Sequence, residues 1–336
     1  IPYITKPEKH ALVDYDRGTV NEVYDKIEKD LKLGISLVSD AYYKHPKFHF
    51  NKKAAYAFAS RFYLMKGDWK AVIAYSDYVL GGDPKRMLRP WRQYANELEF
   101  NHKNLRYNST DEPANLLMTT TESRLARTTP TEKYGSTFET VDKVFAKTGI
   151  EGARDYEKMN FIGTYIFTSS LAPVTTGRYL AKFDELSNVE STGSKPRGLY
   201  VTNVLFSVDE VLLNRMEAYA MLRDYNHAID DYLQYMQGKF GFFPSVERSV
   251  YTSTNSNNYN IYTPFYGLTL KQLAMVKLFL DFRRKEFYQE GLRWFDIRRF
   301  HLAVKRSSNS SYYFPLEKDD PRKVLQIPAE AIQRGL

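Results

Sequence analysis

The residues best placed to do chemistry in this sequence recur at helical spacing between positions 283 and 299. Glu286 and Glu290 are four residues apart, so a continuous helix would place both carboxylates on one face, where they could act as an acid/base pair like that of a glycosidase. A general acid, however, needs a raised pKa. The basic neighbours predict that both carboxylates stay ionised, which favours a structural salt-bridge network over an active site.

The rest of this segment supports the same interpretation. Gly291 is expected to interrupt the helix, because glycine supplies the left-handed residue that commonly ends one. Arg293, Asp296 and Arg299 then recur at spacing three on a second short helix. Because aromatic residues surround these charges, we expect partly buried, paired ions, since an unpaired buried charge is very costly.

Searches for other catalytic or metal-binding patterns find none. The sequence contains no H-E-x-x-H, no G-x-S-x-G and no phosphate loop, and it has no cysteine. Among six histidines, only His45 and His49 are four apart, and they flank Pro46, which argues against a regular helix and hence against a metal site. We expect no catalytic residue, no metal and no cofactor.

The composition is that of a globular protein with an unusual share of aromatic residues. The sequence has 336 residues, a formal net charge of +8, and 27 Tyr and 21 Phe. Basic residues are spread along its length among acidic ones, which argues against nucleic-acid binding. The charge better suits acidic ligands or an anionic membrane surface.

Several helices are predicted from start signals and apolar periodicity. Capping boxes are expected at Thr19–Glu22, Ser207–Glu210 and Thr269–Gln272. Apolar residues then follow at helical spacing, and the helix after Ser207 is expected to bury one side.

Two helical hairpins are also predicted. The first joins a helix over 52–66 to a helix over 69–80, and the second joins 208–223 to 225–237. Both place Tyr five residues before a turn Asp and an aromatic residue just after it. This patterning resembles tetratricopeptide repeats, but a long insert separates the two hairpins, so they are not in tandem.

Binding is best sought in two non-helical excursions, 81–127 and 238–268, which are rich in aromatic residues and Asn. Sugar rings present apolar C–H faces and a rim of hydroxyls, so their sites need flat aromatic platforms beside hydrogen-bonding groups. The alternative is that these aromatic residues pin the loops to the helical body. Trp69 and Trp294 lie on helical stripes and are expected in the core, whereas Trp91 is the best candidate platform. The predicted ligand-binding residues are Trp91, Arg92, Tyr94, Tyr107, Tyr251, Tyr259, Tyr262 and Tyr266.

Five segments, taken in order, resemble the SusD/RagB family. Residues 17–31 are similar to R-x-T-V-x-E-V-Y-x-x-I-x-x-D-L, and residues 51–68 to N-K-x-A-A-x-A-x-x-A-R-x-Y-L-x-x-G-D. Residues 208–219 contain E-V-L-L-x-R-x-E-A-Y, residues 283–299 read R-x-x-E-F-x-x-E-G-x-R-W-F-D-I-x-R, and residues 325–332 look like L-x-P-I-P-x-x-E-I.

The sequence departs from the family pattern in two places. Phe282 stands where an acidic residue often precedes the first Arg, and Gln333-Arg334 replaces the usual Asn-Pro. The opening residues 1–5 resemble the family's mid-sequence G-I-P-x-V-T stretch, so the sequence is expected to be a piece that starts late.

The resemblance implies a mainly α fold, an SusD-like α/α superhelix of irregular tetratricopeptide-like pairs with long loop-rich excursions. We expect one SusD-like domain over 1–336, with helical pairs near 19–80 and 207–306 and ligand-face excursions near 81–206 and 238–268.

The resemblance also implies a function. Family members are surface lipoproteins, not known for catalysis, which capture nutrients for a TonB-dependent outer-membrane barrel. The implied ligand is an oligosaccharide, and the implied membrane link is an N-terminal lipid anchor absent from this sequence. Two alternatives stay open: a peptide-capturing member of the same family, and a helical-repeat adaptor that binds a partner protein.

Overall fold

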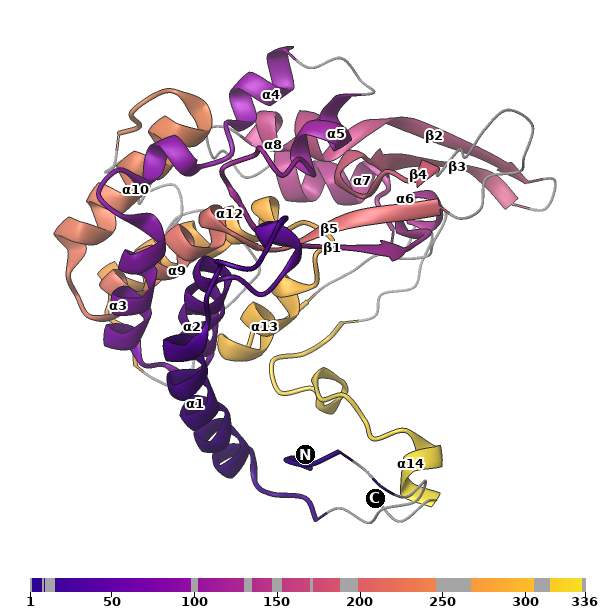
Figure 1. The fold of residues 1–336 in the computed structure, drawn as a ribbon. Coiled ribbons are helices and arrows are strands. Elements are labelled where there is room, and N and C mark those ends of the chain that lie inside the picture. The colour runs from indigo at the N-terminus through magenta and orange to yellow at the C-terminus, as the bar shows by residue number, and fades with distance from the viewer. Residues whose placement is uncertain are drawn as a thin grey trace.

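The protein is mainly helical, as predicted (Figure 1). The computed structural model describes residues 2–7, 9, 16–97, 102–129, 135–146, 153–169, 172–187, 199–245, 267–304 and 315–333. The scaffold consists of seven helices in its described parts: α1 (Val20–Leu37), α2 (Lys52–Lys66), α3 (Trp69–Leu80), α9 (Val208–Met221), α10 (Tyr225–Phe240), α12 (Leu270–Glu286) and α13 (Leu292–Arg299). None of the helices in these parts is long and apolar enough to cross a membrane.

The α2/α3 hairpin confirms the bounds predicted for it. Gly67 takes φ 79°, in the left-handed region that favours glycine, and ends α2. The next residue, Asp68, caps α3 by accepting a 3.1 Å hydrogen bond from the amide of Ala71. A two-residue turn is therefore enough to reverse the backbone direction.

The second hairpin, α9/α10, uses the same capping chemistry with different bounds. Its first helix ends at Met221, and Arg223 takes φ 64° in the turn. Asp224 caps α10, which then continues to Phe240, three residues beyond the prediction. The two hairpins contact each other through α3 and α9, although a long insert separates them in sequence.

Two of the three predicted capping boxes are complete. The hydroxyls of Thr19 and Thr269 each accept a backbone amide, and Glu22 and Gln272 return the bond. At the start of α9, Ser207 accepts from the amide of Glu210 at 3.2 Å, but the Glu210 carboxylate accepts instead from Arg61 at 2.6 and 2.5 Å. The Arg61–Glu210 ion pair between α2 and α9 thus takes the place of the second hydrogen bond of the capping box, in which the Glu210 carboxylate would accept from the backbone amide of Ser207.

Helix α9 lies at the centre of the scaffold and is buried on nearly all sides, so the prediction of a one-sided apolar stripe is wrong. It contacts α2, α3, α10 and α12. Each of its buried charged residues has an ion-pair partner on another helix, which offsets the cost of burial. These pairs are Asp209–Lys239, Glu210–Arg61, Arg215–Asp231 and Glu217–Arg299.

The interval between the hairpins, predicted as loop-rich, carries regular structure in its described parts. Short helices follow α3, and the non-helical interpretation of 81–127 is therefore wrong. Pro84 and Pro90 stand at or just before the first turn of two of them, where proline is tolerated. The helical elements are η2 (Pro84–Met87), α4 (Trp91–Glu97), α5 (Lys103–Tyr107), α6 (Leu125–Thr128), α7 (Phe138–Val141), the π-helical turn η4 (Asp142–Ala146), α8 (Ala153–Asn160) and η5 (Ala181–Phe183).

Antiparallel strands complete this interval. One sheet has the order β1-β5-β4, with β1 (Asn115–Glu122), β4 (Leu186–Ser187) and β5 (Leu199–Ser207). A separate hairpin pairs β2 (Phe161–Ser169) with β3 (Ala172–Leu180) and projects to one side of the molecule (Figure 1). The register pairs Asn115 with Ser207, so β1 begins beside the residue at which β5 ends.

The C-terminal segment is fastened to the body at its start and extends away from it further on. An antiparallel bridge joins Val304 to Leu316, and the Lys323 ammonium donates to the carbonyl of Leu302 at 2.8 Å. Beyond η6 (Pro321–Lys323), the backbone extends to α14 (Ala329–Gln333), which Figure 1 shows well apart from α9 and α12. A small helix of this kind therefore adds little to the core.

Candidate functional site

Glu286, one of the two candidate acid/base residues, lies inside the scaffold. Its carboxylate accepts hydrogen bonds from Trp91 Nε1 at 2.7 Å, Tyr235 OH at 3.0 Å and Lys239 Nζ at 2.8 Å. Only 3% of Glu286 is exposed. Burial raises the pKa of this carboxyl above its usual value, against the opposing effect of the Lys239 charge. Burial thus acts against the prediction that basic neighbours keep Glu286 ionised, because removal from water disfavours the charged carboxylate.

Glu290 does not share a helix with Glu286. Helix α12 ends at Glu286, and Gly291 takes φ 83° at the start of α13 rather than at the end of α12. Glu290 accepts from Lys182 at 2.6 Å and from the hydroxyl of Tyr107 at 3.2 Å. The two carboxylates therefore have separate partners from separate elements, and they do not form a facing pair.

The remaining charges of this segment link α9, α12 and α13. Arg283 donates to Asn214 at 2.6 Å and lies 3.5 Å from Asp296. Arg299 pairs with Glu217 at 2.5 Å and with Asp296 at 2.9 Å. These contacts support the structural salt-bridge interpretation of residues 283–299, with partners both on α9 and within the segment, where Asp296 pairs with Arg299 three residues later.

Trp91 is not an exposed platform, and that prediction is wrong. The residue is 0% exposed, whereas Trp69 and Trp294, both expected in the core, are only partly buried. The Trp91 ring packs against Tyr107 and Tyr156, at centroid distances of 6.3 and 5.5 Å. A sugar would have to displace core residues to reach it.

Tyr94 and Tyr107 are also closed to a stacking ligand. Tyr94 is 0% exposed and the guanidinium of Arg106 lies 4.1 Å from its ring centroid. Tyr107 is 5% exposed and the guanidinium of Arg89 lies 3.8 Å from its ring. Cations occupy the ring faces that a sugar would need, as cation–π geometry favours.

Arg92 is the described member of the predicted set that does reach solvent, with 45% of its side chain exposed. Its Nε lies 3.2 Å from Asp155 of α8, and its guanidinium lies 4.9 Å from the ring of Phe242, just after α10. The next residue, Phe243, is 63% exposed. Arg92 therefore lies against Phe242, where the backbone leaves α10, and the exposed Phe243 follows Phe242 in the sequence.

The other four predicted residues, Tyr251, Tyr259, Tyr262 and Tyr266, lie outside the described residues. Phe242 and Phe243 precede that segment in the sequence. Arg92 contacts Phe242, and a joint site of Arg92 with these four tyrosines stays a prediction.

Three short helices, α4, α5 and α8, lie close together (Figure 1). Arg92 of α4 pairs with Asp155 of α8, and Tyr94 of α4 packs under Arg106 of α5. Lys103 of α5 closes the ring by donating to the carbonyl of Lys158 on α8 at 2.6 Å. We call this the α4–α5–α8 surface and define it by Arg92, Lys103, Arg106, Asp155 and Lys158, together with the adjoining Phe242 and Phe243, while the buried Tyr94 lies beneath it.

Sequence reasoning did not select the basic residues of α5 and α8 for this surface. Lys103 and Arg106 are three apart, a spacing that places them together on a helix, but residues 81–127 were not expected to be helical. The i, i+3 spacing of Trp91 and Tyr94, after Pro90, could have indicated α4 and its inward face.

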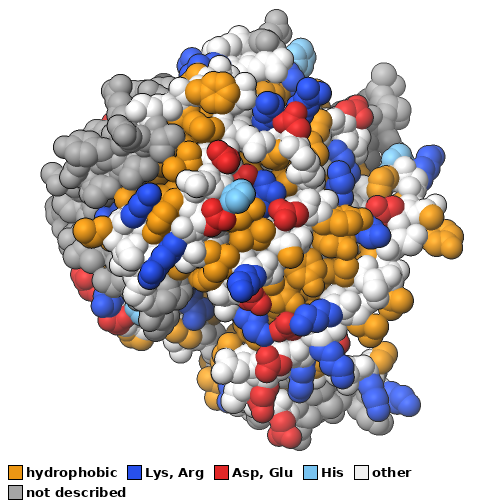
Figure 2. Space-filling view, turned by 90° about the vertical axis from the view of Figure 1, so that its left-hand side faces the viewer, with side chains coloured by type: hydrophobic (Ala, Val, Ile, Leu, Met, Phe, Trp, Pro, Cys, Tyr) orange, Lys and Arg blue, Asp and Glu red, His pale blue; other side chains and the backbone are white. Residues whose placement is uncertain are grey.

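Two other features are less suited to sugar. A cavity of about 360 Å³ between the N-terminal segment, α1 and α2 is lined mainly by hydrophobic groups, with Asp30 already accepting from the hydroxyl of Tyr3. On the α2/α3 hairpin, Tyr78 is 46% exposed and stacks on Tyr56 at 3.7 Å. Figure 2 shows hydrophobic residues clustered near the middle of one face, with charged residues around them. The cavity and the Tyr78–Tyr56 stack both offer apolar area with few free hydrogen-bonding groups.

The histidines considered for a metal are separated by a short turn. His45 precedes the 3₁₀ turn η1 (Pro46–Phe48), and the ring of His49 stacks on Tyr43 at 4.4 Å. Within the residues that the structure describes, three or more His, Asp or Glu residues are nowhere arranged to hold a metal ion.

Two family models match the sequence. Residues 1–64 match a model described as starch-binding associating with outer membrane, and residues 76–327 match the SusD family model. A search of curated proteins finds no match.

Solved structures resemble the fold. A SusD-like protein from Bacteroides fragilis is 18% identical with a TM-score of 0.60, over 99% of the present protein and 73% of that one. A SusD superfamily protein from Bacteroides thetaiotaomicron is 18% identical with a TM-score of 0.60, over 99% and 68%. A SusD-like carbohydrate binding protein from Bacteroides vulgatus is 17% identical with a TM-score of 0.59, over 94% and 65%. At such identities the likeness shows the fold, and the present protein spans only about two thirds of the length of these relatives.

Proposed function

Because the SusD family model matches residues 76–327, most of its length, the protein belongs to the SusD/RagB family, and we propose that it captures oligosaccharide at the outer-membrane surface and delivers it to a TonB-dependent transporter. The family is one of binding proteins rather than enzymes. The family match is the observation that carries this proposal. The structurally similar protein from Bacteroides vulgatus, described as carbohydrate binding, supports the ligand class.

The α4–α5–α8 surface has the groups that such a ligand needs. Phe243 offers an exposed aromatic face, and Arg92, which contacts the preceding Phe242, offers hydrogen-bond donors. We propose that Tyr251, Tyr259, Tyr262 and Tyr266, which follow Phe243 in the sequence, add further stacking and hydroxyl contacts. Trp91, Tyr94 and Tyr107 would support this surface from beneath rather than touch the sugar.

The proposed mechanism is capture and hand-over without bond cleavage. Aromatic rings stack on the C–H faces of the sugar, and Arg and Tyr groups hydrogen-bond to its hydroxyls. The partner barrel then receives the ligand. The description of the model matching residues 1–64 supports a place at the outer membrane, where we propose that a lipid anchor outside this sequence holds the protein.

Calorimetric titration with a panel of neutral and acidic oligosaccharides tests this function. Tyr262→Ala and Arg92→Ala should each weaken binding about threefold to tenfold, because a contact of this kind contributes about 0.5–1.5 kcal/mol. Tyr42→Ala is the matched control, since Tyr42 is 90% exposed and lies on the connection after α1.

The outcomes separate the candidate functions. Binding of one glycan class, weakened by either site variant at an unchanged melting temperature, supports the proposal. Peptide binding with no glycan binding would instead assign the peptide-capturing role. Co-purification with a TonB-dependent barrel tests the delivery step.

A further inference from the structure

We propose that the α4–α5–α8 surface is a subsite for the carboxylate of an acidic sugar, so that the captured glycan contains uronate residues. This inference rests on the proposed function and adds the chemical class of the ligand. Its basis is an excess of positive charge at a surface that contacts hold in one arrangement.

The three contacts that close the ring fix the positions of its cations. Arg92 is held by Asp155, Arg106 by the ring of Tyr94, and Lys103 by the carbonyl of Lys158. Because α4, α5 and α8 are tied pairwise, the exposed Arg92, the partly buried Arg106 and the buried Lys103 are held in one fixed group. A site whose residues are already ordered loses less entropy when a ligand binds.

The charges within this ring are not balanced. Arg92 is paired with Asp155, but within the described residues Lys103, Arg106 and Lys158 form no ion pair with a carboxylate. The nearby Glu157 is engaged by Arg178 at 3.1 Å. An anion from outside the protein would supply the missing negative charge.

Among the described cations of this surface, Lys103 is the clearest case of a charge without a carboxylate partner. The residue is only 8% exposed, and its ammonium has a backbone carbonyl as its hydrogen-bond partner. Burial, together with the positive charge of Lys158, lowers the pKa of Lys103 below its usual value. Buried cations usually have a carboxylate partner, so this environment favours a bound anion.

Arg106 has the geometry to receive a carboxylate. Its planar guanidinium is stacked 4.1 Å from the Tyr94 ring centroid, and stacking leaves the N–H groups at the rim of the plane available as donors. Arginine binds carboxylates through two parallel hydrogen bonds, which gives both strength and orientation. Lys103, one helical turn away, would add a second positive charge.

The test compares two ligands that differ in the charge of the carboxyl group and in the methyl group that esterifies it. A galacturonate oligosaccharide and its methyl ester have the same rings, but the ester lacks the carboxylate charge. We expect the acid to bind at least about tenfold more tightly at low salt, a preference that shrinks as salt screens the charges.

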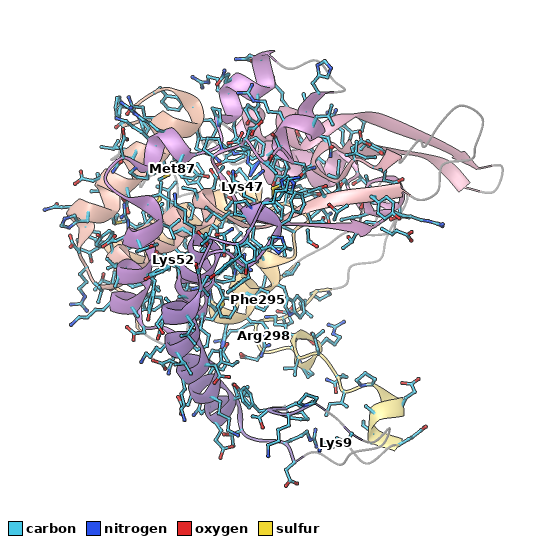
Figure 3. The ribbon with its side chains drawn as sticks, viewed as in Figure 1. Lys9, Lys47, Lys52, Met87, Phe295 and Arg298 are labelled. Atoms are coloured by element: carbon cyan, nitrogen blue, oxygen red, sulfur yellow. The ribbon has the colours of Figure 1, made fainter. Side chains whose placement is uncertain are left out.

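Variants then identify the side chains that bind the ligand carboxylate. Arg106→Gln should remove the preference for the acid, Arg106→Lys should keep part of it, and Lys103→Met should reduce it. Arg298→Gln is the matched control, because Arg298 is exposed on α13, and Figure 3 shows it far from α4, α5 and α8. Melting temperatures verify that each variant is folded. If a variant fails to fold, binding of the acid to the parent protein is measured at increasing salt concentration instead.

Each outcome decides between the proposals. Equal binding of acid and ester, or equal effects of Arg106→Gln and Arg298→Gln, overturns this inference while leaving the proposed function in place. Equal binding of a glutamate peptide and the galacturonate would overturn the assignment to sugar. Failure of every neutral and acidic glycan to bind would overturn the proposed function itself.

Discussion

The indole Nε1 of Trp91 donates a 2.7 Å hydrogen bond to Oε2 of Glu286, a residue 195 positions later in the sequence. Both residues are buried. The bond fastens α4, which carries Arg92 on its outer side, to α12 in the helical scaffold. Glu286, which the sequence offered as an acid/base candidate, therefore holds α4 and the α4–α5–α8 surface against the scaffold.

Trp91→Ala should destabilise the fold rather than act selectively on binding. Removing a fully buried Trp leaves a cavity and leaves Glu286 Oε2 with the Tyr235 hydroxyl as a remaining donor, with a loss of about 3–5 kcal/mol. Urea denaturation measures this change. Trp69→Ala, at a partly buried site, should cost less, and an unchanged midpoint for Trp91→Ala would contradict the buried position.

Lys239→Met should be strongly destabilising at neutral pH. Lys239 pairs with Asp209 at 2.5 Å and with Glu286 at 2.8 Å. Its loss leaves the buried Glu286 carboxylate without its ion-pair partner and Asp209 with the more distant Arg89, at 3.9 Å, at a cost of about 3–5 kcal/mol. Because burial already raises the pKa of Glu286, protonation relieves this penalty, and the deficit should shrink as pH falls toward the usual value of 4.5. Denaturation at several pH values measures it, and a deficit that grows in acid would refute this account.

Glu28→Gln should remove an acid-sensitive contact between α1 and α2. Hydrogen bonds from Lys32 and Lys66 lower the pKa of Glu28 to about 2. A carboxyl with a depressed pKa stabilises the folded state above its unfolded value of 4.5, and this stability is lost as pH falls through about 2. We expect a loss of about 1 kcal/mol at pH 7, because solvent reaches the pair, and little difference from the parent at pH 2.

A charge-matched control for Glu28→Gln is Asp25→Asn. Asp25 also approaches Lys66, at 3.4 Å, but its side chain is 74% exposed. Its replacement should have a smaller effect at every pH. Equal effects of the two substitutions would show that overall charge, and not the Glu28 contacts, controls the acid response.

Gly238→Ala should destabilise α10, although alanine usually favours a helix. A Cβ at this position would lie 2.7 Å from the carbonyl oxygen of Lys85 and 2.9 Å from a methyl group of Leu88. Backbone movement at η2 would be needed, at a cost of about 1–3 kcal/mol.

Gly34→Ala in α1 provides the opposite expectation. No atom lies within 4 Å of a Cβ there, so the substitution should stabilise the protein by about 0.5–1 kcal/mol. Thermal denaturation of the two variants compares them, and the same sign for both would contradict the close approach of η2 to Gly238.

The helices of the scaffold could be predicted from local signals. Turn glycines, capping residues and apolar periodicity placed α2 and α3 at their observed bounds. The strands could not be predicted in this way, because β1 pairs with β5 across most of the insert. Burial around α9 also depends on partners from four other helices, and periodicity along one helix does not contain that information.

The candidate site illustrates the same limit. The sequence shows that Trp91 is aromatic and outside the main helical stripes, but its burial depends on Glu286, Tyr107 and Tyr156, all distant in sequence. The exposed position of Arg92 could be predicted, because a charged side chain can reach solvent without contacts to residues distant in sequence. The family resemblance drawn from five segments was confirmed, since those segments belong mainly to the scaffold.

The sheet that joins the insert to the scaffold has an evolutionary consequence. Asn115 pairs with Ser207, and the amide of Val208 donates to the carbonyl of Ala114 at 2.9 Å, so the part of the insert from β1 to β5 enters and leaves at adjacent points. Residues between these points can change in length and sequence without altering the separation that the scaffold must accommodate. Such a junction would let descendants of one scaffold exchange the segment between β1 and β5, which carries α8, while α4 and α5 stay in place, and it offers protein engineers a natural site for transplanting such segments.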